Sequence, residues 1–296
     1  MITARIHNAQ GLAKYKEGKY QEALTYFDRA IKENPKFAEA YTNRGMVYAM
    51  QSHFAKAIED HDRAITLKPS ISQPFNNRGY TFILKGDYDR ALTDLNQAIK
   101  IDPKSAIAYS NRGLAYYHKK EYDKTIEDST NAIRLDPKLA IAWNNRGLAH
   151  HDKGEFEAAL KDLDRALKLD PNMATAFSNR GMTYESIGQL DKALEDLDKA
   201  IRLSPQDHIK YRLRGQVYKK LGELDNAVND YNKVIELDPN SIEGHLERGL
   251  CYYKQGNNEP AAADFDWVLK NSSDEEVQEF AQDHLRELKA SKAKRR

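Results

Sequence analysis

The chain has 296 residues, of which 31% are charged and 40% are hydrophobic, and its 46 basic residues are balanced by 45 acidic ones. This near-neutral balance argues against a surface that binds nucleic acid along its whole length. No apolar run approaches the roughly 18 residues that a membrane-spanning helix needs, and the first residues lack the apolar core of a signal peptide. We therefore expect a cytoplasmic protein. The single cysteine, Cys251, cannot form an internal disulfide and is expected to be a small buried core residue.

Prolines divide the chain at a constant interval of 34 residues. They stand at Pro35, Pro69, Pro103, Pro137, Pro171, Pro205 and Pro239. A helix should end before each of them, because proline cannot continue it. Between two prolines a second breaker, usually glycine, separates two segments whose apolar residues recur with a period near 3.6. Each interval is therefore predicted to hold two helices joined by a tight turn.

In chain order, the pattern predicts eight helical hairpins followed by one more helix. The hairpins are expected at residues 2–35, 36–69, 70–103, 104–137, 138–171, 172–205, 206–239 and 240–273. Residues 274–290 place Val277, Phe280, Ala281, Leu285 and Leu288 along one helical face, which predicts a helix that caps the last hairpin. The basic residues 291–296 are expected to form a disordered tail, or otherwise to contact nucleic acid or an acidic membrane surface.

Small and aromatic residues recur at the same places in successive hairpins. An aromatic residue opens the first helix, a glycine follows, a second aromatic stands three residues later, and alanines recur in the second helix. One set is Tyr41, Gly45, Tyr48, Ala57 and Ala64. In these columns residues 2–273 resemble the tetratricopeptide repeat (TPR) family. The resemblance implies an all-α fold, a right-handed α-solenoid superhelix in which the first helix of each hairpin lines a concave groove.

An arginine column departs from the common TPR pattern. Arginine precedes the glycine in seven hairpins, and an aspartate follows sixteen residues later, from Arg44 and Asp60 to Arg248 and Asp264. The first hairpin lacks both, since Gln10 and Tyr26 take their places. We expect seven Arg–Asp ion pairs that join the two helices of a hairpin, or neighbouring hairpins. The alternative is an arginine ladder for anionic ligands.

An asparagine column runs along the predicted inner side of the first helices. Its members are Asn43, Asn77, Asn111, Asn145 and Asn179, and Asn76 and Asn144 stand beside two of them. An asparagine amide can donate to one backbone group and accept from another, so the column could bind the main chain of an extended peptide. It resembles the asparagine-lined TPR superhelix of O-GlcNAc transferase, whereas a carboxylate clamp would need basic residues that are absent here. The alternative is that the amides solvate the groove or bond neighbouring helices.

Further residues on this side are predicted to contact a ligand. Tyr80, Leu114 and Tyr117 belong to an apolar floor together with Met50, Ile83, Leu84 and Leu148. Lys219, Lys220 and Lys254 follow towards the C-terminal end. The apolar residues would add affinity, and the lysines would favour an acidic ligand segment.

The leading functional prediction is a non-enzymatic scaffold that binds an extended peptide or a partner's segment in the groove. No phosphate-binding loop, zinc-ligand spacing or nucleophile motif occurs, so no cofactor, metal or catalysis is expected. His118, His150, His151 and Asp152 come nearest to a metal cluster, but adjacent helical residues point in different directions. The alternatives are a recognition arm of an enzyme such as a glycosyltransferase, with catalysis on another chain, and a homotypic assembly scaffold. Ile2 and Ile6 leave room for self-association through the N-terminal hairpin, and neither membrane nor nucleic-acid partners are expected.

Overall fold

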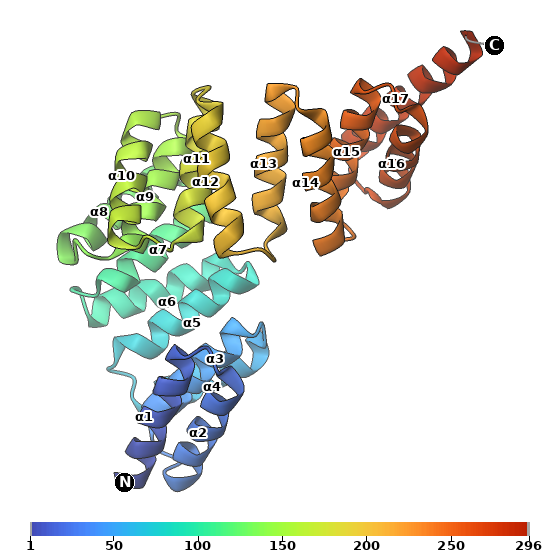
Figure 1. The fold of residues 1–296 in the computed structure, drawn as a ribbon. Coiled ribbons are helices and arrows are strands. Elements are labelled where there is room, and N and C mark those ends of the chain that lie inside the picture. Colours follow the sequence, from blue (N-terminus) through green and yellow to red (C-terminus); the bar gives the residue numbers. More distant parts are fainter. Residues whose placement is uncertain (1, 295–296) are drawn as a thin grey trace. The chain divides into compact units, whose positions relative to one another are not determined.

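The computed structural model describes residues 2–294, with the side chains of residues 2–290. Every regular element within this range is an α-helix, so the chain is an all-α solenoid (Figure 1). It divides into two compact units, Met1–Ala158 and Ala159–Arg296, which we describe one at a time. None of the described helices is both long enough and apolar enough to cross a membrane.

The first unit is a stack of helical hairpins. The first helices of its hairpins are α1 (Ile2–Lys16), α3 (Ala38–Met50), α5 (Ser72–Lys85), α7 (Ala106–His118) and α9 (Ala140–Asp152). The second helices are α2 (Tyr20–Glu33), α4 (Phe54–Leu67), α6 (Tyr88–Ile101) and α8 (Tyr122–Leu135). Consecutive helices pack against one another, and each first helix also contacts the next first helix, from α1 to α9. We call the surface that these five helices share the first-helix face.

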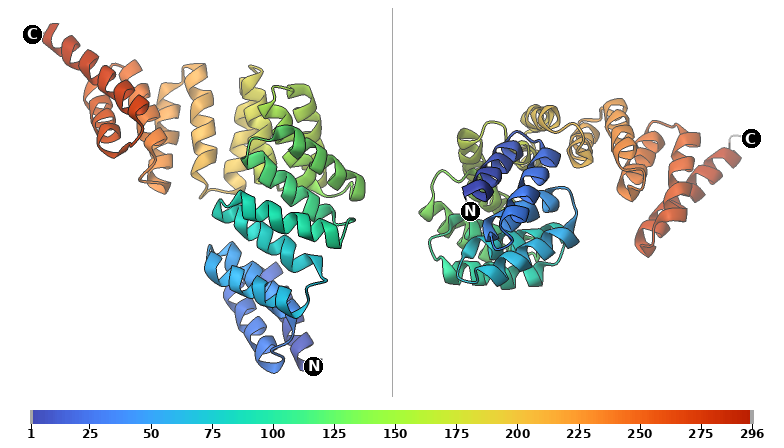
Figure 2. Two further views of the ribbon diagram at one scale, coloured as in Figure 1. Left: turned by 180° about the vertical axis from the view of Figure 1, so that it is seen from behind. Right: turned by 90° about the horizontal axis from the view of Figure 1, so that it is seen from below.

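The second unit repeats this arrangement. Helix α10 (Phe156–Leu169) crosses the boundary between the units. It is followed by α11 (Ala174–Ser186), α12 (Leu190–Leu203), α13 (His208–Leu221), α14 (Leu224–Leu237), α15 (Ile242–Lys254) and α16 (Asn258–Asn271). Helix α17 (Glu275–Lys294) packs against α16, as both views in Figure 2 show.

The C-terminal helix covers the apolar side of the last hairpin. Val277, Ala281, Leu285 and Leu288 pack into the cluster that contains Phe265. Phe280, predicted for the same side, is instead 42% exposed, with its ring 4.4 Å from that of His284. Helix α17 also runs beyond the predicted range 274–290, because lysine and alanine are good helix formers. Residues 291–294 of the predicted disordered tail therefore belong to this helix, and residues 295–296 lie outside the described residues.

Residues with a positive φ close the turns between paired helices. Gly86 and Gly222 end α5 and α13 in the left-handed conformation, with φ of 83° and 79°. Glycine adopts this conformation without steric cost. Ser52 and Lys120 occupy the same place in two other hairpins, with φ of 60° and 61°. The backbone of these two residues is therefore strained, whereas the glycine turns avoid this strain.

The glycines inside the first helices allow the two helices of a hairpin to approach closely. A Cβ atom on Gly79 would lie 2.8 Å from Leu95 Cγ and 3.2 Å from the Ala91 carbonyl oxygen. The space is filled by Leu95, which is fully buried in a cluster with Phe82. The helix-propensity cost of glycine, about 1 kcal/mol, is offset by this packing.

Candidate functional site

The arginine and aspartate columns meet within the hairpins. Arg44 donates from Nε and Nη2 to the two carboxylate oxygens of Asp60, at 2.8 and 2.7 Å. The same bidentate pair joins Arg78 to Asp94, Arg112 to Asp128, Arg180 to Asp196, Arg214 to Asp230 and Arg248 to Asp264. All six aspartates are buried. Six of the seven predicted pairs are thus confirmed, while Arg146 and Asp162 belong to different units and their pairing stays a prediction.

The same arginines also join each hairpin to the one before it. Arg44 Nη1 donates to Asp28 at 2.6 Å, and the corresponding nitrogens of Arg112 and Arg146 donate to Asn96 and Thr130. The hydrogen bonds to Asp94 raise the pKa of Arg78 above its ordinary value. Since these guanidinium groups bond inside the protein, the geometry does not favour an arginine ladder for anionic ligands.

The asparagine column bonds neighbouring first helices. Asn43 Nδ2 donates to Asn8 Oδ1 at 2.9 Å, and Asn111 Nδ2 donates to Asn76 Oδ1 at 3.0 Å. Asn145 Nδ2 donates to the Ser110 carbonyl oxygen at 3.3 Å. These three amides are buried, and each uses one of its two N–H donors within the protein, so their binding to a ligand stays a prediction.

The other asparagines lie in different surroundings. Asn144 is buried and donates to Asn145 Oδ1 at 3.4 Å, and Asn179 lies half-buried on α11 in the second unit. Asn77 Oδ1 accepts from Asn76 Nδ2 at 3.1 Å, whereas Asn77 Nδ2 is buried without a partner. Thr42 stands 35 residues before Asn77, which is the position of the acceptor for the other three amides. Its hydroxyl donates to the Ala38 carbonyl within its own helix at 3.0 Å. The amide nitrogen of Asn77 is thus buried and unpaired, whereas the equivalent nitrogen of Asn145 donates to Ser110.

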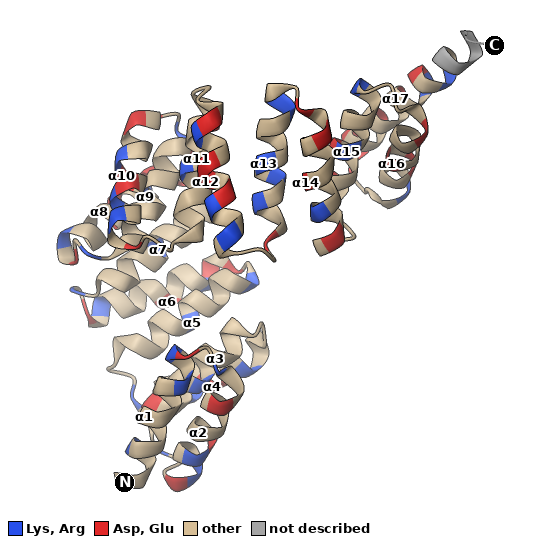
Figure 3. Ribbon diagram, in the orientation of Figure 1, with Lys and Arg blue, Asp and Glu red and all other residues tan. Residues whose placement is uncertain are grey.

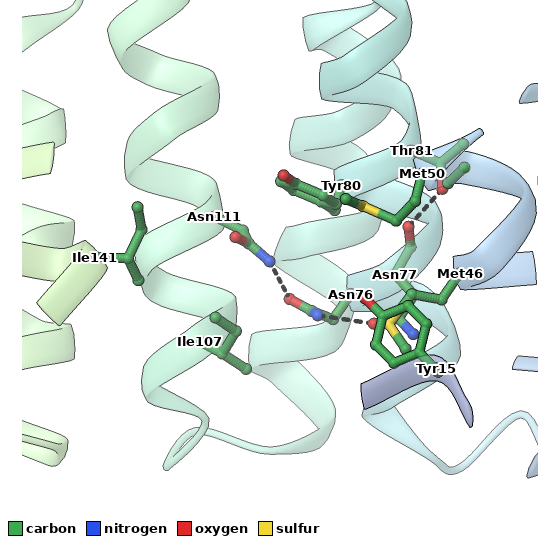
Figure 4. A pocket seen from close by; sticks show the side chains of 11 residues that line it. Tyr15, Met46, Met50, Asn76, Asn77, Tyr80, Thr81, Ile107, Asn111 and Ile141 are labelled. Atoms are coloured by element: carbon green, nitrogen blue, oxygen red, sulfur yellow. Dashed lines mark hydrogen bonds between the residues drawn. The ribbon is translucent and has the colours of Figure 1, made fainter. Parts of the chain in front are cut away.

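A cavity of about 370 Å³ opens on the first-helix face beside this asparagine (Figure 4). We call it the apolar cavity. Its lining comes from five successive first helices: Tyr15, Met46, Ala49, Met50, Asn76, Asn77, Tyr80, Thr81, Ile107, Asn111 and Ile141. None of these lining residues is an aspartate, glutamate, lysine, arginine or histidine. Burial raises the pKa of both tyrosines, so their phenol groups stay neutral at physiological pH.

The cavity includes part of the predicted apolar floor. Tyr80 and Met50 line it, whereas Leu114 packs against the cluster that contains Phe82. Tyr117 donates its hydroxyl to Asp152 Oδ2 at 2.6 Å and so joins α7 to α9. Met46 is not among the residues predicted from the sequence, although it stands 34 residues before Tyr80 in the same column. Tyr15 is likewise not among the predicted residues, although it stands 68 residues before Ile83 and 102 residues before Tyr117 in one column.

The predicted lysines lie in a separate, charged depression of the second unit. Lys219 pairs with Glu247, and Lys220 pairs with Glu185. Lys254 lines the same depression of about 470 Å³. The two glutamates nearly balance the lysines, so the expected preference for an acidic ligand is weakened. Basic and acidic residues are likewise interspersed along α12 and α14 (Figure 3).

The histidines that came nearest to a metal cluster have other neighbours. His118 stacks on Tyr88 with ring centroids 4.9 Å apart, and His150 Nδ1 lies 2.5 Å from a carboxylate oxygen of Glu155. Asp152 accepts the hydrogen bond from Tyr117. Within the described part of the chain, no group of three or more His, Cys, Asp or Glu side chains could hold a metal ion.

Family models match the chain along most of its length. Models described as tetratricopeptide repeat match residues 8–70, 106–139, 140–173 and 174–207, and a model described as TPR repeat matches residues 79–120 and 215–256. No curated protein matches the chain.

Solved structures share the fold at low sequence identity. The crystal structure of the APC/C hetero-tetramer Cut9–Hcn1 is 17% identical with a TM-score of 0.77, covering 91% of this chain and 52% of that chain. The human IFIT1 dimer with m7Gppp-AAAA is 21% identical with a TM-score of 0.63, covering 90% and 68%. Pseudomonas aeruginosa pilF is 20% identical with a TM-score of 0.60, covering 72% and 97%. The chain thus spans about half the length of the first of these structures, and the likeness concerns the fold alone.

Proposed function

Because the chain belongs to the tetratricopeptide repeat family, we propose that it is a non-enzymatic scaffold that binds an extended peptide, or an extended segment of a partner protein, on the first-helix face of its first unit. The observation that carries the proposal is the apolar cavity, to which all five first helices of this unit contribute. A ligand that follows the face would run across the helices and meet one helix about every 8–10 Å.

The chemistry of the face favours apolar contacts over main-chain recognition by asparagine. Asn43, Asn111 and Asn145 are buried, and each already donates one amide N–H inside the protein. Met50 and Ile107, by contrast, are 46% and 43% exposed at the cavity. Covering such side chains contributes roughly 25 cal/mol for each Å² of apolar surface removed from water.

A peptide fits this face better than a nucleic acid does. The IFIT1 dimer was solved with m7Gppp-AAAA, and proteins that hold nucleic acid neutralise its phosphates with lysine and arginine. The lining of the apolar cavity contains neither residue. The cytoplasmic location expected from the sequence belongs to the same proposal.

Photo-crosslinking tests where a partner binds. A photoreactive phenylalanine analogue replaces Ile107 on α7, and, as the matched control, Glu127, which is exposed on the second helix α8. We expect crosslinks to short synthetic peptides from position 107 and none from position 127. Equal yields from the two positions, or no peptide binding by the unmodified chain, would contradict the proposal.

A second copy of the chain is a further proposed partner, through the N-terminal hairpin. Ile2 and Ile6 on α1 are 78% and 50% exposed, and large exposed apolar side chains favour association. Light scattering at increasing concentration tests this contact. A mass that rises with concentration in the parent, and less in the variant Ile2→Ser with Ile6→Ser, is expected; a constant monomer mass contradicts it.

A further inference from the structure

We propose that the apolar cavity selects one large, uncharged apolar side chain of the bound peptide and thereby sets which sequences the first unit accepts. This inference rests on the proposed function, because it requires that a peptide lies on the first-helix face. The inference adds the chemical class of the anchoring side chain, which is aromatic or large and aliphatic, such as leucine. It also adds the subsite that binds this side chain.

The amide and threonine side chains of the cavity bond to one another or to the backbone. Asn111 donates to Asn76, and Asn76 donates to Asn77, in a chain of amides along the wall. Thr81 Oγ1 donates to the Asn77 carbonyl oxygen at 2.8 Å. Figure 4 shows these bonds as the dashed lines between the lining residues. A polar side chain entering here would lose its bonds to water and find few replacements, which is unfavourable.

The unpaired amide of Asn77 does not change this chemistry. Its Nδ2 atom is buried as well as unpaired, so it offers no donor at the cavity surface in the observed conformation. What the lining offers to an incoming side chain is therefore the surface of methionine, isoleucine and tyrosine side chains.

The lining of the cavity disfavours a charged anchoring side chain. A lysine, arginine, aspartate or glutamate placed in the cavity would meet no ionised partner among the lining residues. The charged depression of the second unit differs, because its first helices supply charged side chains that pair with one another. Lys219 pairs with Glu247, and Lys220 pairs with Glu185. The first unit is thus the part of the chain suited to an uncharged anchor.

The size and composition of the cavity fit one anchoring residue. Its volume of about 370 Å³ is close to the lower end of ligand pockets, which span roughly 300–1,000 Å³. Met46 and Met50 lie on one side, and methionine adapts its shape to different apolar partners. The exposed fractions of Met50 and Ile107, 46% and 43%, mean that an anchor would cover apolar surface that is otherwise in water.

The test combines a peptide library with charge substitutions at the exposed edge of the cavity. Ile107→Glu and Ile107→Lys place either sign of charge at the cavity, and the exposure of Ile107 allows both variants to fold. Thr93→Glu is the matched control, because Thr93 is exposed on the second helix α6 of the same unit and does not line the cavity. Circular dichroism and the unfolding midpoint check that each variant is folded before binding is measured.

The expected result has three parts, measured by fluorescence anisotropy with labelled peptides from the library. Peptides that bind the parent share one large apolar residue, and replacing it with alanine weakens binding roughly 10- to 100-fold. Both Ile107 variants weaken binding to a similar extent, whichever sign they carry. Thr93→Glu leaves binding within about twofold of the parent, which is the scatter expected of an uninvolved site.

Three results would overturn the inference while leaving the proposed function intact. In the first, the peptides that bind the parent share no large apolar residue. In the second, the Ile107 variants bind like the parent. In the third, the loss of binding depends on the sign of the charge introduced at position 107. If no library peptide binds the folded parent chain, the proposed function fails together with the inference.

Discussion

Replacement of His61 by leucine should reduce the acid sensitivity of the first unit. His61 lies on α4 and is completely buried, and neither ring nitrogen has a hydrogen-bond partner. The equivalent residue is leucine in three other hairpins, at Leu95, Leu163 and Leu197. Burial, followed by the charge of Arg78, lowers the pKa of His61 to about 3.

The sign of the pH dependence follows from this lowered pKa. The unfolded chain, with an ordinary histidine pKa of about 6.5, binds the proton first. The contribution of neutral His61 is therefore fully present above about pH 6.5 and is lost as the pH falls from there towards 3. Between about pH 7.5 and about pH 5.5 the expected loss in the free energy of unfolding is about 1.4 kcal/mol.

Urea unfolding followed by circular dichroism, at both pH values, measures this loss. The parent should lose about 1.4 kcal/mol more than His61→Leu between the two conditions. The variant should also be more stable at the higher pH, because it no longer buries unpaired nitrogens, each of which costs roughly 1–3 kcal/mol. His53→Leu, at an exposed residue next to the same helix, is the control and should keep the parental loss. An equal loss in His61→Leu and the parent would refute this reasoning.

Three further substitutions test other parts of the packing by the unfolding midpoint. Thr42→Asn should stabilise the chain by about 1 kcal/mol, because it supplies Asn77 Nδ2 with the acceptor that Asn8 and Asn76 supply to the following hairpins; a lowered midpoint would show that the larger side chain does not fit. Lys120→Gly should stabilise by roughly 0.5–1 kcal/mol by relieving the left-handed backbone at φ 61°, whereas Gly86→Lys should do the opposite. Arg112→Met should cost about 3–5 kcal/mol, because it leaves the buried carboxylate of Asp128 unpaired, and adding Asp128→Leu should recover part of this loss; no recovery would mean that the packing of arginine, and not its charge, is what matters.

The sequence by itself determined the features that depend on residues within one hairpin. The interval of 34 residues predicted paired helices, and proline and glycine marked where they end, because both act through the backbone of their own segment. The constant separation of sixteen residues predicted Arg–Asp pairs, such as Arg44 with Asp60 and Arg248 with Asp264.

Only the tertiary structure decided the features that depend on neighbouring hairpins. The asparagine column looks uniform in the sequence, yet its amides differ in the structure: Asn8 accepts from Asn43, whereas Asn77 Nδ2, with Thr42 at the place of Asn8, has no partner. The apolar cavity joins side chains of five first helices from Tyr15 to Ile141, so no single repeat contains it. Hydrogen bonds and cavities form between surfaces brought together by stacking, and their chemistry follows from spatial neighbours that a repeating sequence pattern does not distinguish.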